Sequence, residues 1–166
     1  MKAIVVYESL WGNTAAVARA IAEGIGSGTP ALTTSEATGE YLNDVDLIVA
    51  GAPVLAFSLP TDQIRESIQK DPKHAQHPPD TTNPSMRLWL QKLPKGLGRS
   101  AAFETRIWWS PGGSTNAITR MLEKAGYPPV AKRERFVVKG TYGPLREGEL
   151  EKARRWGNQL ASLVPA

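Results

Sequence analysis

The stretch Ala3–Thr14 reads AIVVYESLWGNT, and the fold can be worked out from it. Its first five residues are apolar and rich in β-branched side chains, as a strand buried on both faces requires. Beyond the loop, apolar residues recur at helical spacing from Thr14 to Ile25, and Gly26 and Pro30 then end the helix. A strand that passes through a tight loop into a helix is the first unit of a parallel α/β sheet.

The same alternation continues along the chain. Further strands are expected at Ala31–Thr34, Asp46–Ala50, Ser100–Thr105 and Arg135–Lys139, and further helices near Thr61–Gln69, Ser85–Leu93, Ile118–Ala125 and Leu150–Val164. The Pro-rich stretch Asp71–Ser85 is typical of a loop. We therefore expect one α/β domain over residues 1–166, a doubly wound five-stranded parallel sheet with three αβα layers.

Composition narrows the chemistry that the chain supports. It has no cysteine, which excludes a disulfide framework, a thiol nucleophile and a cysteine-ligated metal or iron–sulfur centre. Redox chemistry must therefore use an organic cofactor or a metal on other ligands. The run Ala3–Tyr7 is too short for a secretory signal, and no apolar stretch approaches the roughly 20 residues of a membrane helix. We expect a soluble cytoplasmic protein that does not associate with membranes.

Charge is distributed unevenly along the chain. Residues 1–85 contain five Lys or Arg and ten Asp or Glu, a formal charge of −5, whereas residues 86–166 contain 15 and six, a formal charge of +9. The basic residues are scattered over several expected elements and form no run with interleaved aromatic residues. Nucleic-acid binding is therefore not expected.

The loop Ser9–Thr14 has the features of a phosphate site. It joins the first strand to the first helix, where backbone N–H groups and the positive end of the helix dipole point at a bound anion. Gly12 lets the backbone approach such a ligand closely. The same residues also suit a simple helix cap and turn. No P-loop or dinucleotide-binding glycine motif follows the strand.

This loop resembles the phosphate motif of the flavodoxin family, which has Ser or Thr at its first and third positions, Gly at the fourth and Thr at the sixth. Ser9, Gly12 and Thr14 match that pattern. Trp11 departs from the usual small hydroxyl residue, but it is similar to the Trp in this loop of flavodoxin domains from flavo-diiron proteins. The departure removes one hydroxyl donor and leaves the backbone donor.

Two later segments extend the resemblance. Asp46–Pro53 resembles the third strand and flavin loop of the family, and Ala101–Arg106 followed by Gly112–Ser114 resembles the fourth strand and its loop. The resemblance covers nearly the full chain, which looks most like the small flavodoxin-domain proteins of actinobacteria. It implies the strand order 2-1-3-4-5, with FMN bound beyond the carboxyl ends of the strands, between strands one and three.

The implied FMN site draws on three loops. Its cofactor-binding residues are Ser9, Leu10, Trp11, Gly12, Asn13 and Thr14, then Ala52, Pro53, Val54, Leu55 and Phe57, then Thr105, Arg106, Trp108 and Trp109. Phe57, Trp108 and Trp109 are candidates to cover the flavin ring, against the alternative that they serve other contacts. Arg106 beside the ring would stabilise anionic reduced flavin; the alternative is a solvated or salt-bridged arginine at a strand end.

Two pairs of titratable residues receive no role. His74 and His77 lie three residues apart, as in half of a metal site, but no further ligands are evident and a solvated loop fits them better. Glu8 and Glu104 both lie at carboxyl ends of expected strands, yet nothing in their spacing demands a general acid–base pair. We predict no catalytic residue and no metal site.

Three functions remain open. The leading one is an electron carrier whose FMN accepts electrons from a reductase and passes them on. The second is an NAD(P)H- or quinone-linked FMN reductase of the same fold. The third is an interaction module without FMN, for which the bulky Trp11 and the pair Trp108–Trp109 argue. The carrier needs a redox partner protein, expected to present an acidic patch to the basic side of the chain. That side is expected to include some of Arg99, Arg106, Arg120, Lys132 and Arg133. The oligomeric state is left open.

Overall fold

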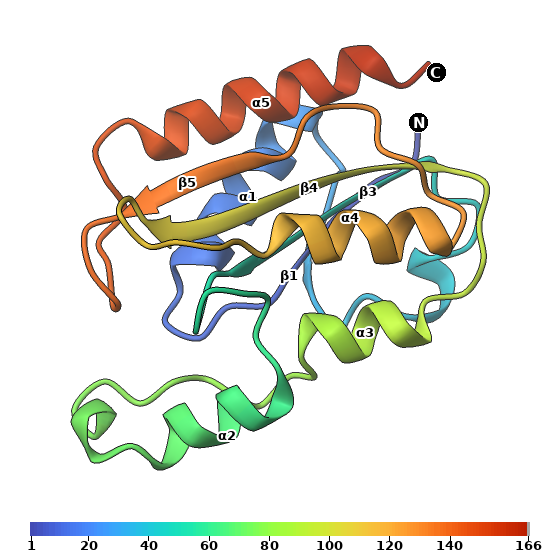
Figure 1. Ribbon diagram of the computed structural model, residues 1–166. Coiled ribbons are helices and arrows are strands. Elements are labelled where there is room, and N and C mark those ends of the chain that lie inside the picture. The colour runs from blue at the N-terminus through green and yellow to red at the C-terminus, as the bar shows by residue number, and fades with distance from the viewer. Residues whose placement is uncertain (166) are drawn as a thin grey trace.

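A five-stranded parallel sheet forms the centre of the molecule in the computed structural model, which describes residues 1–165 (Figure 1). The strands are β1 (Ala3–Tyr7), β2 (Ala31–Thr33), β3 (Leu47–Pro53), β4 (Arg99–Ile107) and β5 (Glu134–Val138). The helices are α1 (Asn13–Ile25), α2 (Asp62–Lys70), α3 (Met86–Lys92), α4 (Thr115–Lys124) and α5 (Glu149–Leu163), with short 3-10 helices at Gly39–Tyr41 and Pro72–His74. The strand order is β2-β1-β3-β4-β5 with every pairing parallel, which confirms the predicted fold class and order.

Alternate residues of β1 enter two separate cores. Ile4 and Val6 pack in the core formed with α3 and α4, whereas Ala3 and Val5 pack in the core formed with α1 and α5. Because successive side chains of a strand point to opposite faces, an uninterrupted apolar run needs cover on both sides. Figure 1 shows the resulting layers, with helices on both faces of the sheet.

Two glycines allow α1 and α5 to approach each other closely. A Cβ atom on Gly157 would overlap the carbonyl oxygen of Ile21, and one on Gly24 would overlap that of Arg154. These helices cover the sheet on the face opposite α3 and α4, and Trp156 from α5 fills the core beneath them. None of the helices within residues 1–165 is long and apolar enough to cross a membrane.

Several element boundaries differ from expectation. β3 continues to Pro53 because Ala52 and Pro53 pair with Glu104 and Thr105, and β4 continues to Ile107 because Arg106 and Ile107 pair with Val137 and Val138. The stretch 71–85 is loop as expected, apart from its 3-10 helix, and Figure 1 shows it with α2 on an arm that projects away from the sheet.

Candidate functional site

The carboxyl ends of β1, β3 and β4 surround a cavity of about 70 Å³, here called the crevice. It is lined by Ser9, Leu10, Trp11, Asn13, Thr14, Pro53, Val54, Leu55, Thr105, Arg106, Ile107, Val138 and Thr141. The fold thus brings together residues from all three of the loops singled out in the sequence. Small-molecule sites usually enclose about 300–1,000 Å³, so the crevice accommodates only the narrow end of a larger ligand.

The N-terminus of α1 opens beside this crevice without a side-chain cap. Gly12 occupies the N-cap position with φ 93°, in the left-handed region that glycine adopts without strain. Within the described chain, no side chain caps this end of α1, and its first turn holds no acidic residue. A Cβ atom built on Gly12 would meet nothing within 4 Å. The N–H groups of the first helical turn after Gly12, together with the positive end of the helix dipole, are therefore available to an anion.

The loop holds its shape through bonds of its own. The Gly12 N–H donates a hydrogen bond to Ser9 Oγ at 3.0 Å, and the Ser9 hydroxyl keeps its own proton to donate. The hydroxyls of Thr14 and Thr105 lie 2.7 Å apart and both residues are buried. Two hydroxyls carry two protons, and their mutual bond uses one, so this pair can donate one further hydrogen bond into the crevice.

Trp11 anchors an aromatic cluster on the outer side of the same loop. Its Nε1 donates to the carbonyl oxygen of His77 at 2.8 Å, and its ring centroid lies 5.3 Å from those of both His74 and Tyr142. His74 is buried and its Nδ1 lies 2.6 Å from the Tyr142 hydroxyl oxygen, so the expectation of a solvated His74 was wrong. His77 is exposed and stacks on Tyr142 at 4.5 Å. No group of residues that could hold a metal ion is present in residues 1–165.

A second contact ties the projecting arm to the end of β1. Glu8 is buried; its Oε1 accepts a hydrogen bond from the Met86 N–H, and its Oε2 lies 3.3 Å from Arg65 Nε, an ion pair without hydrogen-bond geometry. Burial raises the pKa of the Glu8 carboxyl above its ordinary value of 4.5, against the lowering effects of the Met86 N–H and of Arg65. Glu8 thus serves as an anchor for the arm, since its carboxylate contacts are all with residues of α2 and α3.

The two loops expected to flank a flavin are bonded to each other. The Val54 N–H donates to the Thr105 carbonyl oxygen at 3.0 Å, and the Gly113 N–H donates to that of Phe57 at 3.1 Å. Phe57 has φ 68° and a side chain 64% exposed. Trp108 and Trp109 are each 66% exposed, in the turn that follows β4. These three aromatic side chains lie outside the crevice and form no part of the core.

Ala52 and Gly12 are the other predicted residues that do not line the crevice. Ala52 is fully buried in the core shared with α3 and α4. Gly12 lines a neighbouring cavity of about 270 Å³ on the arm side of the loop. The positive φ of Gly12 explains the glycine on conformational grounds, independently of any close approach by a ligand.

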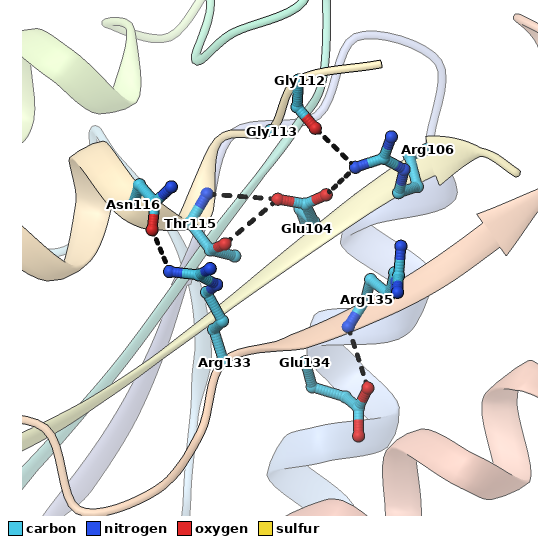
Figure 2. A pocket seen from close by; sticks show the side chains of 9 residues that line it. All are labelled: Glu104, Arg106, Gly112, Gly113, Thr115, Asn116, Arg133, Glu134 and Arg135. Atoms are coloured by element: carbon cyan, nitrogen blue, oxygen red, sulfur yellow. Dashed lines mark hydrogen bonds and ion pairs between the residues drawn. The ribbon is translucent and has the colours of Figure 1, made fainter. Parts of the chain in front are cut away.

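A second, larger cavity of about 580 Å³ lies beside the crevice, on the sheet face that carries α4 (Figure 2). We call it the arginine groove; its lining residues are Glu104, Arg106, Gly112, Gly113, Thr115, Asn116, Arg133, Glu134 and Arg135. Arg106 lines both this groove and the crevice. The two cavities therefore share one guanidinium group.

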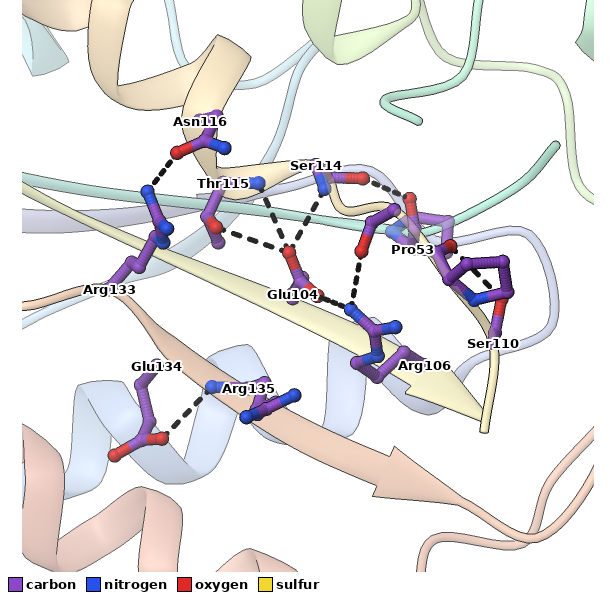
Figure 3. A network of polar contacts seen from close by, with 12 residues as sticks. Pro53, Glu104, Arg106, Ser110, Ser114, Thr115, Asn116, Arg133, Glu134 and Arg135 are labelled. Atoms are coloured by element: carbon purple, nitrogen blue, oxygen red, sulfur yellow. Dashed lines mark hydrogen bonds and ion pairs between the residues drawn. The ribbon is translucent and has the colours of Figure 1, made fainter. Parts of the chain in front are cut away.

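Glu104 organises the polar network at the end of β4 (Figure 3). Its Oε1 accepts hydrogen bonds from the Ser114 N–H, the Thr115 N–H and the Thr115 hydroxyl at 3.0–3.2 Å, which satisfies the first turn of α4. Its Oε2 accepts from Arg106 Nη1 at 2.8 Å, and the same nitrogen also donates to the Gly112 carbonyl oxygen. Arg106 is thus the salt-bridged arginine of the second interpretation, and its charge is offset by a buried carboxylate.

Comparison with known proteins places the fold. No protein-family model matches the chain, and no curated protein sequence matches it. Among solved structures, it is similar to a flavodoxin from the domain Archaea, at 23% identity and TM-score 0.66, covering 98% of this chain and 97% of that one. A flavodoxin from Bacillus cereus gives 15% identity and TM-score 0.66, covering 99% and 100%. The chain has the flavodoxin fold.

The flavodiiron core from Synechocystis sp. PCC6803 is also similar to this chain, at 18% identity and TM-score 0.60, covering 96% of this chain and 35% of that one.

Three residues of the crevice were not predicted from the sequence. They are Ile107, Val138 and Thr141, which the fold brings to the crevice from the ends of β4 and β5 and the turn after β5. Thr141 and Tyr142 follow β5 in a Gly-rich turn with no distinctive pattern. Glu104 carried a signal, because a carboxylate in a buried strand requires a partner, and Arg106 follows it by two residues on the same face.

Proposed function

We propose that the protein binds FMN at the crevice and transfers electrons through it. The observation that carries this proposal is the uncapped N-terminus of α1 beside the crevice, formed by the loop whose residues resemble the flavodoxin phosphate motif. The helix α1 has 13 residues, and its N-terminus has no side-chain cap and has open space above Gly12. Such a helix end fits a phosphate dianion without any cationic side chain.

The Thr14–Thr105 pair supports the same ligand. The hydroxyl proton that the pair does not use between its own two oxygens is a donor at the wall of the crevice. Thr14 itself lies in the first turn of α1. The volume of about 70 Å³ suits a phosphate and the first atoms attached to it, and the flavin ring would then lie at the mouth.

The mouth offers side chains for a planar aromatic ring. Phe57, Trp108 and Trp109 are all more than 60% exposed, so their aromatic faces are available to a ligand or a partner. Bound FMN would supply the one- or two-electron chemistry. The residues of the chain would hold its phosphate, cover part of its ring and set its electrostatic surroundings. Because Glu104 offsets the charge of Arg106, we expect that arginine to shift the flavin potential less than a free cation would.

Reconstitution tests the proposal directly. The purified chain is mixed with FMN, unbound flavin is removed, and the absorbance spectrum is recorded. We expect a protein-bound flavin spectrum at about one flavin per chain. Loss of all flavin on desalting would contradict the proposal and favour an interaction module without FMN. With flavin bound, mixing with NADPH alone separates the carrier from a reductase, since a carrier needs a second protein to be reduced.

The expected redox partner meets a basic surface. Arg120, Lys132 and Arg133 are exposed, and with a partner of complementary charge they would steer association. Arg106 is buried and takes no part in such a surface, and Arg99 begins β4 at the opposite end of the sheet from the crevice. Once a reductase or acceptor is available, its electron-transfer rate should fall markedly between about 0.02 and 0.5 M salt. A flat profile would remove the basic surface from the proposal.

A further inference from the structure

The arginine groove carries more positive charge than its own carboxylates offset. Arg106, Arg133 and Arg135 face it, against the single carboxylate of Glu104, which leaves a formal charge of +2. Figure 2 shows the carboxylate of Glu134 on the other side of β5 from the Arg135 side chain. This carboxylate lies 3.4 Å from Lys152 Nζ. Within residues 1–165, no carboxylate lies within ion-pair distance of Arg133 or Arg135.

The strand register places these cations on one face. Arg135 pairs with Glu104 across β4 and β5, which puts it on the face that carries α4. Arg133, just before β5, donates a hydrogen bond to the Asn116 side chain of α4 on the same face. Glu104 makes its contacts with the first turn of α4 and with Arg106, and it does not lie within ion-pair distance of Arg135. In Figure 2 the Arg135 side chain extends from β5 towards Arg106.

Arg106 adds a buried cation with unused capacity. It is about 9% exposed, and its Nε has no hydrogen-bond partner although it is shielded from solvent. Its Nη1 is bonded to Glu104 and to Gly112, which fixes the guanidinium at the boundary of the groove and the crevice. A buried guanidinium that is fixed in this way and partly unpaired is suited to an anionic ligand.

We propose that the arginine groove binds a phosphate monoester of nucleotide size, next to the crevice but separate from it. Guanidinium groups recognise phosphate through paired N–H donors, and three of them converge here around one cavity. The volume of about 580 Å³ lies in the range of small-molecule sites. Its concave shape and the buried Arg106 favour a small ligand over the flat acidic patch of a protein. The inference goes beyond the proposed function, because the groove does not include the loop Ser9–Thr14.

The test is calorimetric titration of the full chain, without added flavin, with adenosine 2′,5′-bisphosphate at about 0.02 M salt. Adenosine and inorganic phosphate are titrated in parallel. The test variant is R133A/R135A, and the matched control is R99A/R120A, which removes the same charge from exposed positions outside the groove. Each variant is first checked for wild-type thermal unfolding.

We expect the wild type to bind the bisphosphate, and R133A/R135A to lose about tenfold or more in affinity, as for lost charge-assisted hydrogen bonds. The control should stay within about twofold of the wild type, adenosine should not bind, and inorganic phosphate should bind more weakly. Absence of binding by the wild type would overturn the proposal. So would equal losses in the two double variants, or unchanged affinity in R133A/R135A, since the ligand would then bind without these two arginines. Because no flavin is present, failure here leaves the FMN proposal standing.

Discussion

Replacing Gly12 with alanine should weaken FMN binding by more than its effect on folding explains. Gly12 has φ 93°, and an alanine in this conformation lowers the free energy of unfolding by about 1–2 kcal/mol. A Cβ atom at this position would have no protein atom within 4 Å. If the phosphate bound at the end of α1 extends over Gly12, the Cβ displaces it from the first N–H groups of α1. We expect a further loss of about 2 kcal/mol in binding, or roughly 30-fold in Kd, as for a lost charged hydrogen bond.

Gly28 provides a matched control for this variant. It has φ 91°, its Cβ would also meet nothing within 4 Å, and it lies beyond the far end of α1. Gly28→Ala should therefore cost the same stability as Gly12→Ala and leave FMN affinity unchanged. Urea unfolding measures the stability of both, and flavin fluorescence titration measures Kd. Equal Kd values for the two variants would refute the placement of the phosphate.

Three further predictions concern the loop, the helix contact and the buried carboxyl. Thr14→Ala should weaken the binding of FMN more than that of riboflavin, because the Thr14–Thr105 hydroxyl pair serves the phosphate, which riboflavin lacks. Equal losses of affinity for the two flavins would contradict this. Gly157→Ala should lower the free energy of unfolding by about 1–3 kcal/mol through overlap with Ile21, while Gly140→Ala, whose Cβ meets only one atom at 3.8 Å, should change it by less than about 0.5 kcal/mol. Burial raises the pKa of Glu8, so the folded state holds the proton more tightly than the unfolded state does. As pH rises above 4.5, the free energy of unfolding of the wild type should therefore fall relative to that of Glu8→Gln. If urea unfolding from about pH 4.5 to 7 gave the same pH dependence for both proteins, this prediction would be wrong.

The parts of the fold that follow from local pattern were predictable from sequence. Successive side chains of the run Ala3–Tyr7 point alternately into the two cores, and the helical spacing of apolar residues after Thr14 matches α1. Gly12 was identified as part of a phosphate loop, but its left-handed φ appears only in three dimensions. Strand ends were underestimated for a similar reason, since β3 is extended by pairing with β4 and not by its own composition.

Contacts between distant segments were beyond the reach of local pattern. Thr14 and Thr105 are separated by 91 residues, and the cover of His74 by Tyr142 spans 68. A Pro-rich segment with two histidines is typical of a solvated loop unless another segment lies over it. The ion pair of Glu104 could have been predicted from sequence, because Glu104 lies two residues before Arg106 on the same face of a buried strand.

The relative affinity for FMN and riboflavin tests the central claim most directly. Both ligands share the isoalloxazine ring and differ in the phosphate, so their ratio isolates the contribution of the loop at the N-terminus of α1. Titration of the apoprotein should give a Kd for FMN at least about tenfold lower than for riboflavin, from the charge-assisted bonds to the phosphate. Equal Kd values, or no binding of either flavin by the folded protein, would contradict the account.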